Sequence, residues 1–192
     1  MSDNLIRTFI SMPVPNEVKS KKNMLYSTLE NSPANISWVK NEQLHLTLKF
    51  LGHTPESMID NIKTEISKIS STIKPFKLLI GNTGCFPKKE RPRVLWLGIS
   101  GNTAALNDLF LRIDKKMNNI GFPSSDNEFF PHITLAKVKY PQKHTPDIST
   151  FLKSSYDPID FTADRVQFLT SELLPSGTFY SLLGSFPLGE SF

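Results

Sequence analysis

The chain has 192 residues, 39% of them hydrophobic, and carries 22 Lys and Arg against 18 Asp and Glu, a net charge of +4. This composition is typical of a folded domain and excludes a disordered chain. No apolar run approaches the roughly 20 residues that a membrane-spanning helix needs, and the first residues lack the order of a secretory signal. We therefore expect a cytoplasmic protein with no membrane partner. The single cysteine, Cys85, excludes an intrachain disulfide and a thiolate-built zinc site.

The first quarter of the chain predicts a strand, a helix and a second strand. Residues 6–12 favour a strand, which the following prolines would stop because proline cannot donate to a ladder. A helix capped by Asn16 is expected to end before Pro33. The second strand contains His45 and is expected to close at Gly52.

The strand around His45 alternates strictly between polar and apolar residues. Side chains two apart in a strand share a face. His45 and Thr47 therefore point to one face, and an apolar set points to the other: Leu44, Leu46, Leu48 and Phe50. The pattern indicates a strand with one face in the core and one face that carries side chains suited to catalysis or binding.

The middle of the chain predicts a helix and two strands. Thr54 is a good N-cap and Pro55 fits a first helical position, so we expect a helix from here to Pro75. Its apolar face is formed by isoleucines three or four residues apart: Ile59, Ile62, Ile66, Ile69 and Ile73. Strands are expected at residues 76–80 and 94–99, separated by a long basic loop.

The remainder predicts a third helix between Gly101 and Gly121, followed by a strand that carries His132. Its last elements are a short helix at 148–153, a strand at 166–169, a turn at 175–177 and a strand at 179–183.

The His-x-Thr-Leu pattern occurs twice in the chain. His132 and Thr134 share a face, backed by apolar residues, as His45 and Thr47 do. Each copy is followed by a helix, a strand, a loop or turn and a further strand. A duplicated unit explains this order, and two related lobes could bring both polar faces to one cleft.

A lone strand histidine is more often a hydrogen-bonded structural residue than a catalyst, but packing does not explain two in matched contexts. An imidazole titrates near pH 6.5, so one ring can act as an acid and the other as a base. The hydroxyls of Thr47 and Thr134 would donate to a tetrahedral phosphate, although both residues also have high strand propensity. Zinc usually takes three or four protein ligands, so we expect no metal here.

The two motifs and their flanking segments resemble the 2H phosphoesterase superfamily. Within it, the most similar branch is the RNA 2′,3′-cyclic phosphodiesterases, historically called 2′-5′ RNA ligases. The flanking segments that carry the resemblance are residues 7–10, 48–52, 84–87 and 94–98. The resemblance implies an α+β fold in which two pseudo-symmetric lobes of antiparallel strands, with helices outside, form a central cleft. We expect one such two-lobed domain over residues 1–192, acting as a monomer.

The same resemblance implies opening of a ribose 2′,3′-cyclic phosphate to a 2′-phosphomonoester, without metal or other cofactor, on an RNA end or a small cyclic nucleotide. His45 would protonate the departing 3′ oxygen and His132 would activate water, with the roles exchanged for the reverse 2′-5′ ligation. Thr47 and Thr134 would bind the non-bridging oxygens.

Two further positions complete the candidate site. Family members commonly have an arginine where this chain has Lys137, which lacks the bidentate fork of arginine. Strict alternation would put Lys137 on the apolar face, so the strand ends, bulges before it, or lets the lysine reach out to solvent. Phe50 matches an aromatic residue that stacks on the substrate base in similar proteins, while its parity favours the core.

Two other functions fit the sequence. The chain could hydrolyse a different ester, such as ADP-ribose cyclic phosphate or a 2′-5′ oligonucleotide. It could also be an RNA-end-binding module with little turnover. The basic stretch at residues 88–93 and Tyr180 could border the cleft in either case.

Overall fold

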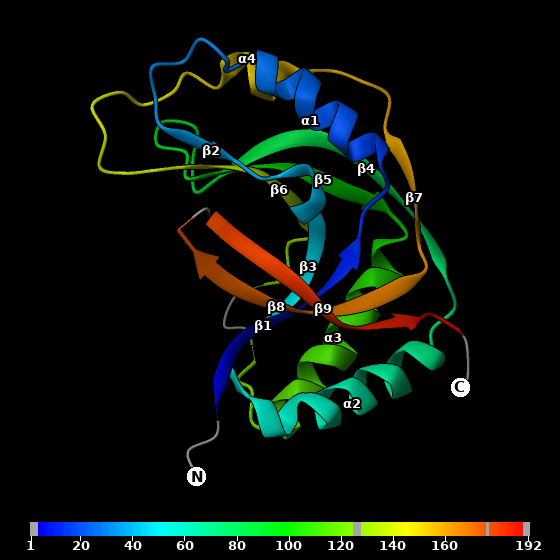
Figure 1. Ribbon diagram of the computed structural model, residues 1–192. Coiled ribbons are helices and arrows are strands. Elements are labelled where there is room, and N and C mark those ends of the chain that lie inside the picture. The colour runs from blue at the N-terminus through cyan, green and yellow to red at the C-terminus, as the bar shows by residue number, and fades with distance from the viewer. Residues whose placement is uncertain (1–3, 125–127, 176, 190–192) are drawn as a thin grey trace.

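A computed structural model describes residues 4–124, 128–175 and 177–189. In this part of the chain one curled sheet of nine strands runs in the order β7-β4-β5-β6-β3-β1-β8-β9, with β2 against β6 (Figure 1). Every strand pair is antiparallel. The strands are β1 (Leu5–Pro13), β2 (Ile36–Trp38), β3 (His45–Pro55), β4 (Phe76–Phe86), β5 (Val94–Gly101), β6 (His132–Val138), β7 (Ile159–Ala163), β8 (Arg165–Leu174) and β9 (Gly177–Pro187).

Helices cover the outside of the two halves of this sheet. They are α1 (Glu17–Ser27), α2 (Ile59–Ser71), α3 (Thr103–Asn119) and α4 (Ser149–Lys153), with short 3-10 turns η1 (Asn41–Gln43) and η2 (Glu56–Met58). In Figure 1, α1 and α4 lie over the half that contains β4, β5 and β6, and α2 and α3 lie under the half that contains β1, β8 and β9. The predicted α+β architecture of antiparallel strands with outer helices is confirmed.

The internal repeat begins one strand earlier than the sequence pattern indicated. Each unit contains a strand, a helix and a histidine strand: β1, α1 and β3 in the first, with the short β2 before β3, and β5, α3 and β6 in the second. Strand β4 then pairs with β5 of the second unit, and β8 pairs with β1 of the first. The units thus exchange strands, and the two histidine strands meet at the centre of the sheet.

The predicted helix start at Thr54 and Pro55 is wrong. Both residues belong to β3, and α2 begins at Ile59 after the turn η2. Thr54 is fully buried, and its hydroxyl lies 2.7 Å from that of Thr8 on β1. Thr54 therefore stabilises the pairing of β3 with β1 and lies five residues before the start of α2, too far to cap it.

The long loop predicted at residues 81–93 is mostly strand. β4 continues to Phe86 through an irregularity at Asn82, whose φ of 57° breaks the ladder with β5. The strand β7 was missed, although its residues alternate buried and exposed. The turn predicted at 175–177 includes Ser176, which lies outside the described residues.

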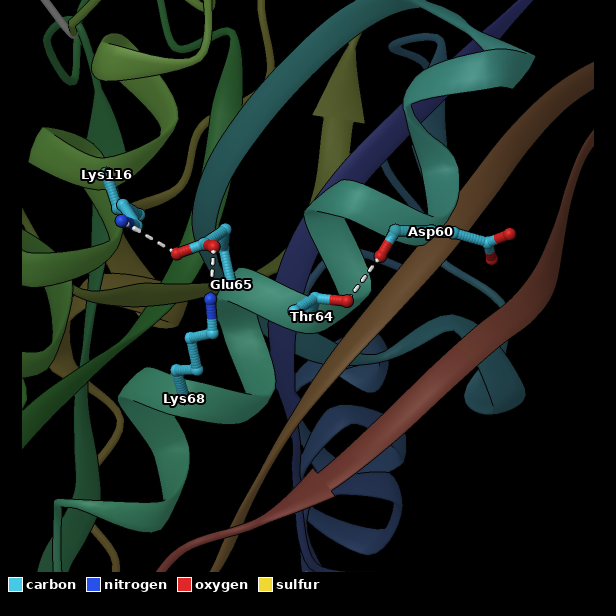
Figure 2. A network of polar contacts seen from close by, with 5 residues as sticks. All are labelled: Asp60, Thr64, Glu65, Lys68 and Lys116. Atoms are coloured by element: carbon cyan, nitrogen blue, oxygen red, sulfur yellow. Dashed lines mark hydrogen bonds and ion pairs between the residues drawn. The ribbon is translucent and has the colours of Figure 1, made fainter.

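The helices α2 and α3, which lie under the half of the sheet that contains β1, β8 and β9, are joined by an ionic network. Glu65 of α2 accepts from Lys68, one turn along α2, and from Lys116 of α3, each at 2.8 Å (Figure 2). Ile62 and Ile66, close to Glu65 on α2, are fully buried in the core. None of the helices described here combines the length and apolar character needed to cross a bilayer.

Candidate active site

The two histidine motifs lie on adjacent strands at the centre of the sheet. Within the described residues, β3 and β6 pair at Leu46 and Ile133, both fully buried. The half-buried motif residues point to the opposite face. Extending the antiparallel register by one residue places His45 opposite Thr134 and Thr47 opposite His132. Cross-strand neighbours have Cβ atoms about 4.5–5.5 Å apart, so each histidine lies near the hydroxyl of the other motif.

A β-bulge in β3 moves Phe50 onto the same face as His45. On β1, Ser11 pairs with Thr47 and Ile10 pairs with Lys49, so Leu48 has no partner in this ladder. The extra residue inverts the alternation. Lys49 is consequently buried and Phe50 is 73% exposed. The prediction from strict alternation, which placed Phe50 in the core, is therefore wrong.

The same bulge occurs at the matching position of β6. On β5, Trp96 pairs with Thr134 and Leu95 pairs with Ala136, which leaves Leu135 as the extra residue. Ala136 is buried and Lys137 is exposed. Of the three alternatives that the sequence left open for Lys137, the strand bulges before it.

Two cavities lie in front of these strands, and because they share lining residues they are described together as the cleft. The first, about 220 Å³, is lined by His45, Thr134 and Lys137 among others, and the second, about 490 Å³, is lined by His132. Thr47 and Phe50 border both. All six residues predicted from the sequence therefore meet at this cleft.

Both imidazoles are held in the same way. The Nδ1 atom of His45 lies 2.7 Å from the carbonyl oxygen of Gln43, and that of His132 lies 2.8 Å from the carbonyl oxygen of Phe130. A carbonyl oxygen only accepts, so each Nδ1 carries the proton. The Nε2 atom of each neutral ring is therefore left with a free lone pair, and each protonated ring has an Nε2–H to donate.

The surroundings of both rings favour the neutral imidazole. Burial lowers the pKa of His45 below the usual 6.5, the charges of Lys137 and His132 lower it further, and the bond to Gln43 opposes them. Burial also lowers the pKa of His132, opposed by the bond to Phe130. A positively charged ring here gains a partner when an anion enters the cleft.

Aromatic rings enclose each histidine, and sequence reasoning missed most of them. Phe9 and Tyr180 contact His45 at centroid distances of 4.9 and 5.5 Å. Phe86 contacts His132 at 5.1 Å. These residues come from β1, β9 and β4. Their position beside the histidines depends on how the strands pair, and the sequence alone does not show that pairing. Other residues that line the cleft and were not predicted include Arg7, Gln43, Glu128, Phe130, Ser171 and Thr178.

The wall beside His132 depends on a glycine. Gly84 of β4 lies opposite Trp96 of β5, and a Cβ at Gly84 would lie 2.1 Å from the indole ring. That ring packs against Phe86 at 5.3 Å and against Phe130 at 5.1 Å.

We expect Gly84→Ala to displace the Trp96 ring, to cost about 1–3 kcal/mol of folding free energy as overpacking does, and to lower activity. Trp fluorescence reports the displacement of the ring, thermal unfolding measures the loss of stability, and hydrolysis of a 2′,3′-cyclic phosphate measures the loss of activity. Gly81→Ala in the same strand is the matched control, because its Cβ would meet Pro158 at an ordinary 3.6 Å. Equal behaviour of the two variants would contradict the role given to Gly84.

The cleft holds few candidate metal ligands. Among residues 4–124, 128–175 and 177–189, no three His, Cys, Asp or Glu side chains come close enough together to hold an ion. The predicted residues at the site offer two imidazoles, two threonine hydroxyls and the ammonium of Lys137, and Arg7 adds a guanidinium. That set suits a phosphate ester.

Comparison with known proteins agrees with this geometry. A family model described as LigT-like phosphoesterase matches residues 12–96. The RNA 2′,3′-cyclic phosphodiesterase of Thermotoga maritima is 34% identical over 179 residues, which cover 93% of each chain. This chain belongs to the LigT-like phosphoesterase family. The protein of the same name from Methanocaldococcus jannaschii is 29% identical over 93% of this phosphoesterase and 98% of its own length.

Solved structures share the fold of this LigT-like chain. TT0787 of Thermus thermophilus superposes with a TM-score of 0.77 at 26% identity, over 97% of this chain and all of that one. E. coli LigT, in the structure with 3′-AMP, gives a TM-score of 0.76 at 21% identity with the same coverage.

Proposed function

We propose that this phosphoesterase hydrolyses 2′,3′-cyclic phosphate ends of RNA to 2′-phosphomonoesters, with His45 and His132 as its acid and base and no metal. The observation that carries the proposal is the matched pair of imidazoles, each with Nδ1 bonded to a backbone carbonyl and Nε2 left for chemistry. Relatives over almost the full chain are named RNA 2′,3′-cyclic phosphodiesterase, which supports the same substrate.

In the hydrolysis, water attacks phosphorus and gives its proton to Nε2 of His132. The bond from phosphorus to the 3′ oxygen breaks, and the Nε2–H of protonated His45 gives its proton to that oxygen. The product is a 2′-phosphomonoester with a free 3′-hydroxyl, and both rings return to their starting states by exchange with solvent. With a 5′-hydroxyl in place of water, the same attack and the same loss of the 3′ oxygen give a 2′-5′ linkage. His132 and His45 therefore keep these roles in ligation and exchange them in the reverse reaction, which cleaves that linkage.

The other residues at the cleft bind the substrate in this proposal. Thr47 and Thr134 donate to the two non-bridging oxygens, and the ammonium of Lys137 offsets the negative charge that grows on them. The exposed ring of Phe50 offers a stacking surface to the terminal base, an interaction of about 1–3 kcal/mol for single-stranded nucleic acid. We further propose that the chain is a single two-lobed domain that acts as a cytoplasmic monomer.

The test is to incubate the purified protein with EDTA and an oligoribonucleotide that ends in a 2′,3′-cyclic phosphate, and to identify the terminal phosphate. A 2′-phosphate at a rate that EDTA leaves unchanged is the expected result. A 3′-phosphate, or loss of the reaction with EDTA, would contradict the proposed chemistry. Binding without any product would favour the RNA-end-binding module, and turnover only of ADP-ribose cyclic phosphate or a 2′-5′ oligonucleotide would favour another ester.

A further inference from the structure

The loop between β4 and β5, residues 87–93, is attached to the wall of the cleft at both ends. It leaves β4 at Phe86, whose ring contacts His132 at 5.1 Å. It enters β5 at Val94, which pairs directly with Lys137. The backbone N–H of Arg93 donates to the carbonyl of Phe86 at 2.6 Å and closes the loop. The loop therefore begins and ends beside residues of the proposed active site.

This loop carries most of the net charge of the chain. It contains four cations and one carboxylate, Glu90, a net charge of +3 out of +4 for the whole protein. All four cations are exposed: Lys88, Lys89, Arg91 and Arg93. Within the described residues none of them forms an ion pair. Cations that have no ion-pair partner are available to neutralise the phosphates of a polyanion.

The loop also has a fixed conformation. The guanidinium groups of Arg91 and Arg93 lie 5.0 and 5.6 Å from the ring centre of Tyr140, so one ring positions both. Pro92, between them, is buried. The N–H of Val138 donates to the carbonyl of Arg93 at 2.9 Å and joins the loop to the end of β6. Its charges are thus held in place beside the cleft, which lowers the entropy that binding would cost.

We propose that this loop binds the sugar-phosphate backbone of an RNA chain upstream of the cyclic phosphate, which makes a polynucleotide the preferred substrate over a mononucleotide. The inference rests on the proposed function. With the terminal phosphate between the two histidines and the ammonium of Lys137, the basic surface continues outward along β6 to the loop. A mononucleoside cyclic phosphate has no further phosphate to place there, whereas each added nucleotide of RNA supplies one.

The experiment compares two substrates and two charge-reversal variants. Lys88→Glu/Lys89→Glu alters the loop. Lys74→Glu/Lys115→Glu is the matched control, because both lysines are exposed and neither lies in the loop or lines the cleft: Lys74 stands between α2 and β4, and Lys115 lies on α3. The substrates are a mononucleoside 2′,3′-cyclic phosphate and an eight-nucleotide RNA with the same end. Binding of a fluorescent eight-nucleotide RNA with a 2′-phosphate end is measured separately by anisotropy over a range of salt concentrations.

For the loop variant we expect KM for the RNA and Kd for the 2′-phosphate RNA to rise about tenfold or more, with kcat/KM for the mononucleotide within twofold of the unaltered protein. The slope of log affinity against log salt should become shallower by about 0.7 for each RNA phosphate that the altered loop no longer neutralises. The control variant should change Kd by less than twofold.

Unchanged KM and Kd in the loop variant, or an equal change in the control variant, would overturn the inference even if both substrates are hydrolysed. A protein that hydrolyses neither substrate but still loses RNA affinity in the loop variant would contradict the proposed function and leave the loop as an RNA-binding surface. The two proposals therefore fail separately.

Discussion

His45→Ala and His132→Ala are each expected to lower kcat for a 2′,3′-cyclic phosphate by about 10²- to 10⁴-fold, the usual contribution of a general acid or base. Each variant removes one Nε2, and the hydroxyls of Thr47 and Thr134 do not replace it because they do not titrate near neutral pH. Product formation under single-turnover conditions measures the effect on the chemical step.

The matched control for this pair is His53→Ala. His53 lies on β3 with His45 but is exposed and outside the cleft. We expect its kcat to stay within twofold of that of the unaltered protein. Circular dichroism and thermal unfolding should show that all three variants fold. Full activity in both the His45 and the His132 variant would end the proposed mechanism.

The lowered pKa of both histidines predicts how kcat/KM and kcat change with pH. The reactive free enzyme has His45 protonated and His132 neutral, and burial lowers both pKa values below 6.5. As pH rises above 6.5 the protonated fraction of His45 falls, so kcat/KM should fall too. A bound phosphate anion raises the pKa of His45, so the basic limb of kcat should lie at a higher pH than that of kcat/KM. A basic limb of kcat/KM above pH 6.5 would contradict the lowered pKa of His45, and a basic limb of kcat at or below that of kcat/KM would contradict the effect of the bound anion.

The sequence was sufficient to predict the histidines and threonines of the site because their alternation is local. A strand of period two places His45 and Thr47 on one face whatever strand lies beside it. The positions of Phe50 and Lys137 were not predictable in this way. Each depends on a bulge, and a bulge exists only relative to a partner strand, here β1 or β5. The sequence shows which residues form a strand. It does not show which of them is left without a partner on the neighbouring strand.

The same limit explains the errors in the fold. Thr54 has the local chemistry of a helix cap, but its hydroxyl is paired with Thr8, 46 residues earlier in the chain. The start of the internal repeat was predicted one strand too late, because its first strands, β1 and β5, do not carry the histidine motif. In both cases the deciding contact joins segments that are distant in sequence.

The matched bulges also explain how a symmetric pair of motifs can bind an asymmetric substrate. The residue five positions after each histidine is moved onto the cleft face by the same bulge, and it is Phe50 in one unit and Lys137 in the other. An aromatic ring suits a base and an ammonium suits a phosphate. The two units thus supply the same catalytic groups and different binding groups, which gives the substrate one preferred direction across the cleft.

The bulge in β3 has a cost in stability, since it turns Lys49 into the core. The Lys49 side chain is 1% exposed, and its ammonium contacts the carboxylate of Asp114 on α3 and donates to the carbonyl of Pro123 at 2.8 Å. Removal of one partner of a buried pair leaves an uncompensated charge, at a cost of about 3–5 kcal/mol. Asp114 therefore ties α3 to the strand that carries His45.

We expect Asp114→Ala to lower the free energy of unfolding by about 3 kcal/mol, and Tm by roughly 6–12 °C for a chain of this size. Asp108→Ala is the matched control, because Asp108 lies on the same helix and pairs with Arg112 at 2.9 Å, but both side chains are about half exposed. Such a surface pair contributes about 0–1 kcal/mol. Lys49→Met/Asp114→Leu should recover much of the loss, since it removes both charges and fills the space. If Asp114→Ala unfolds no earlier than Asp108→Ala, the buried pair does not hold α3 against β3.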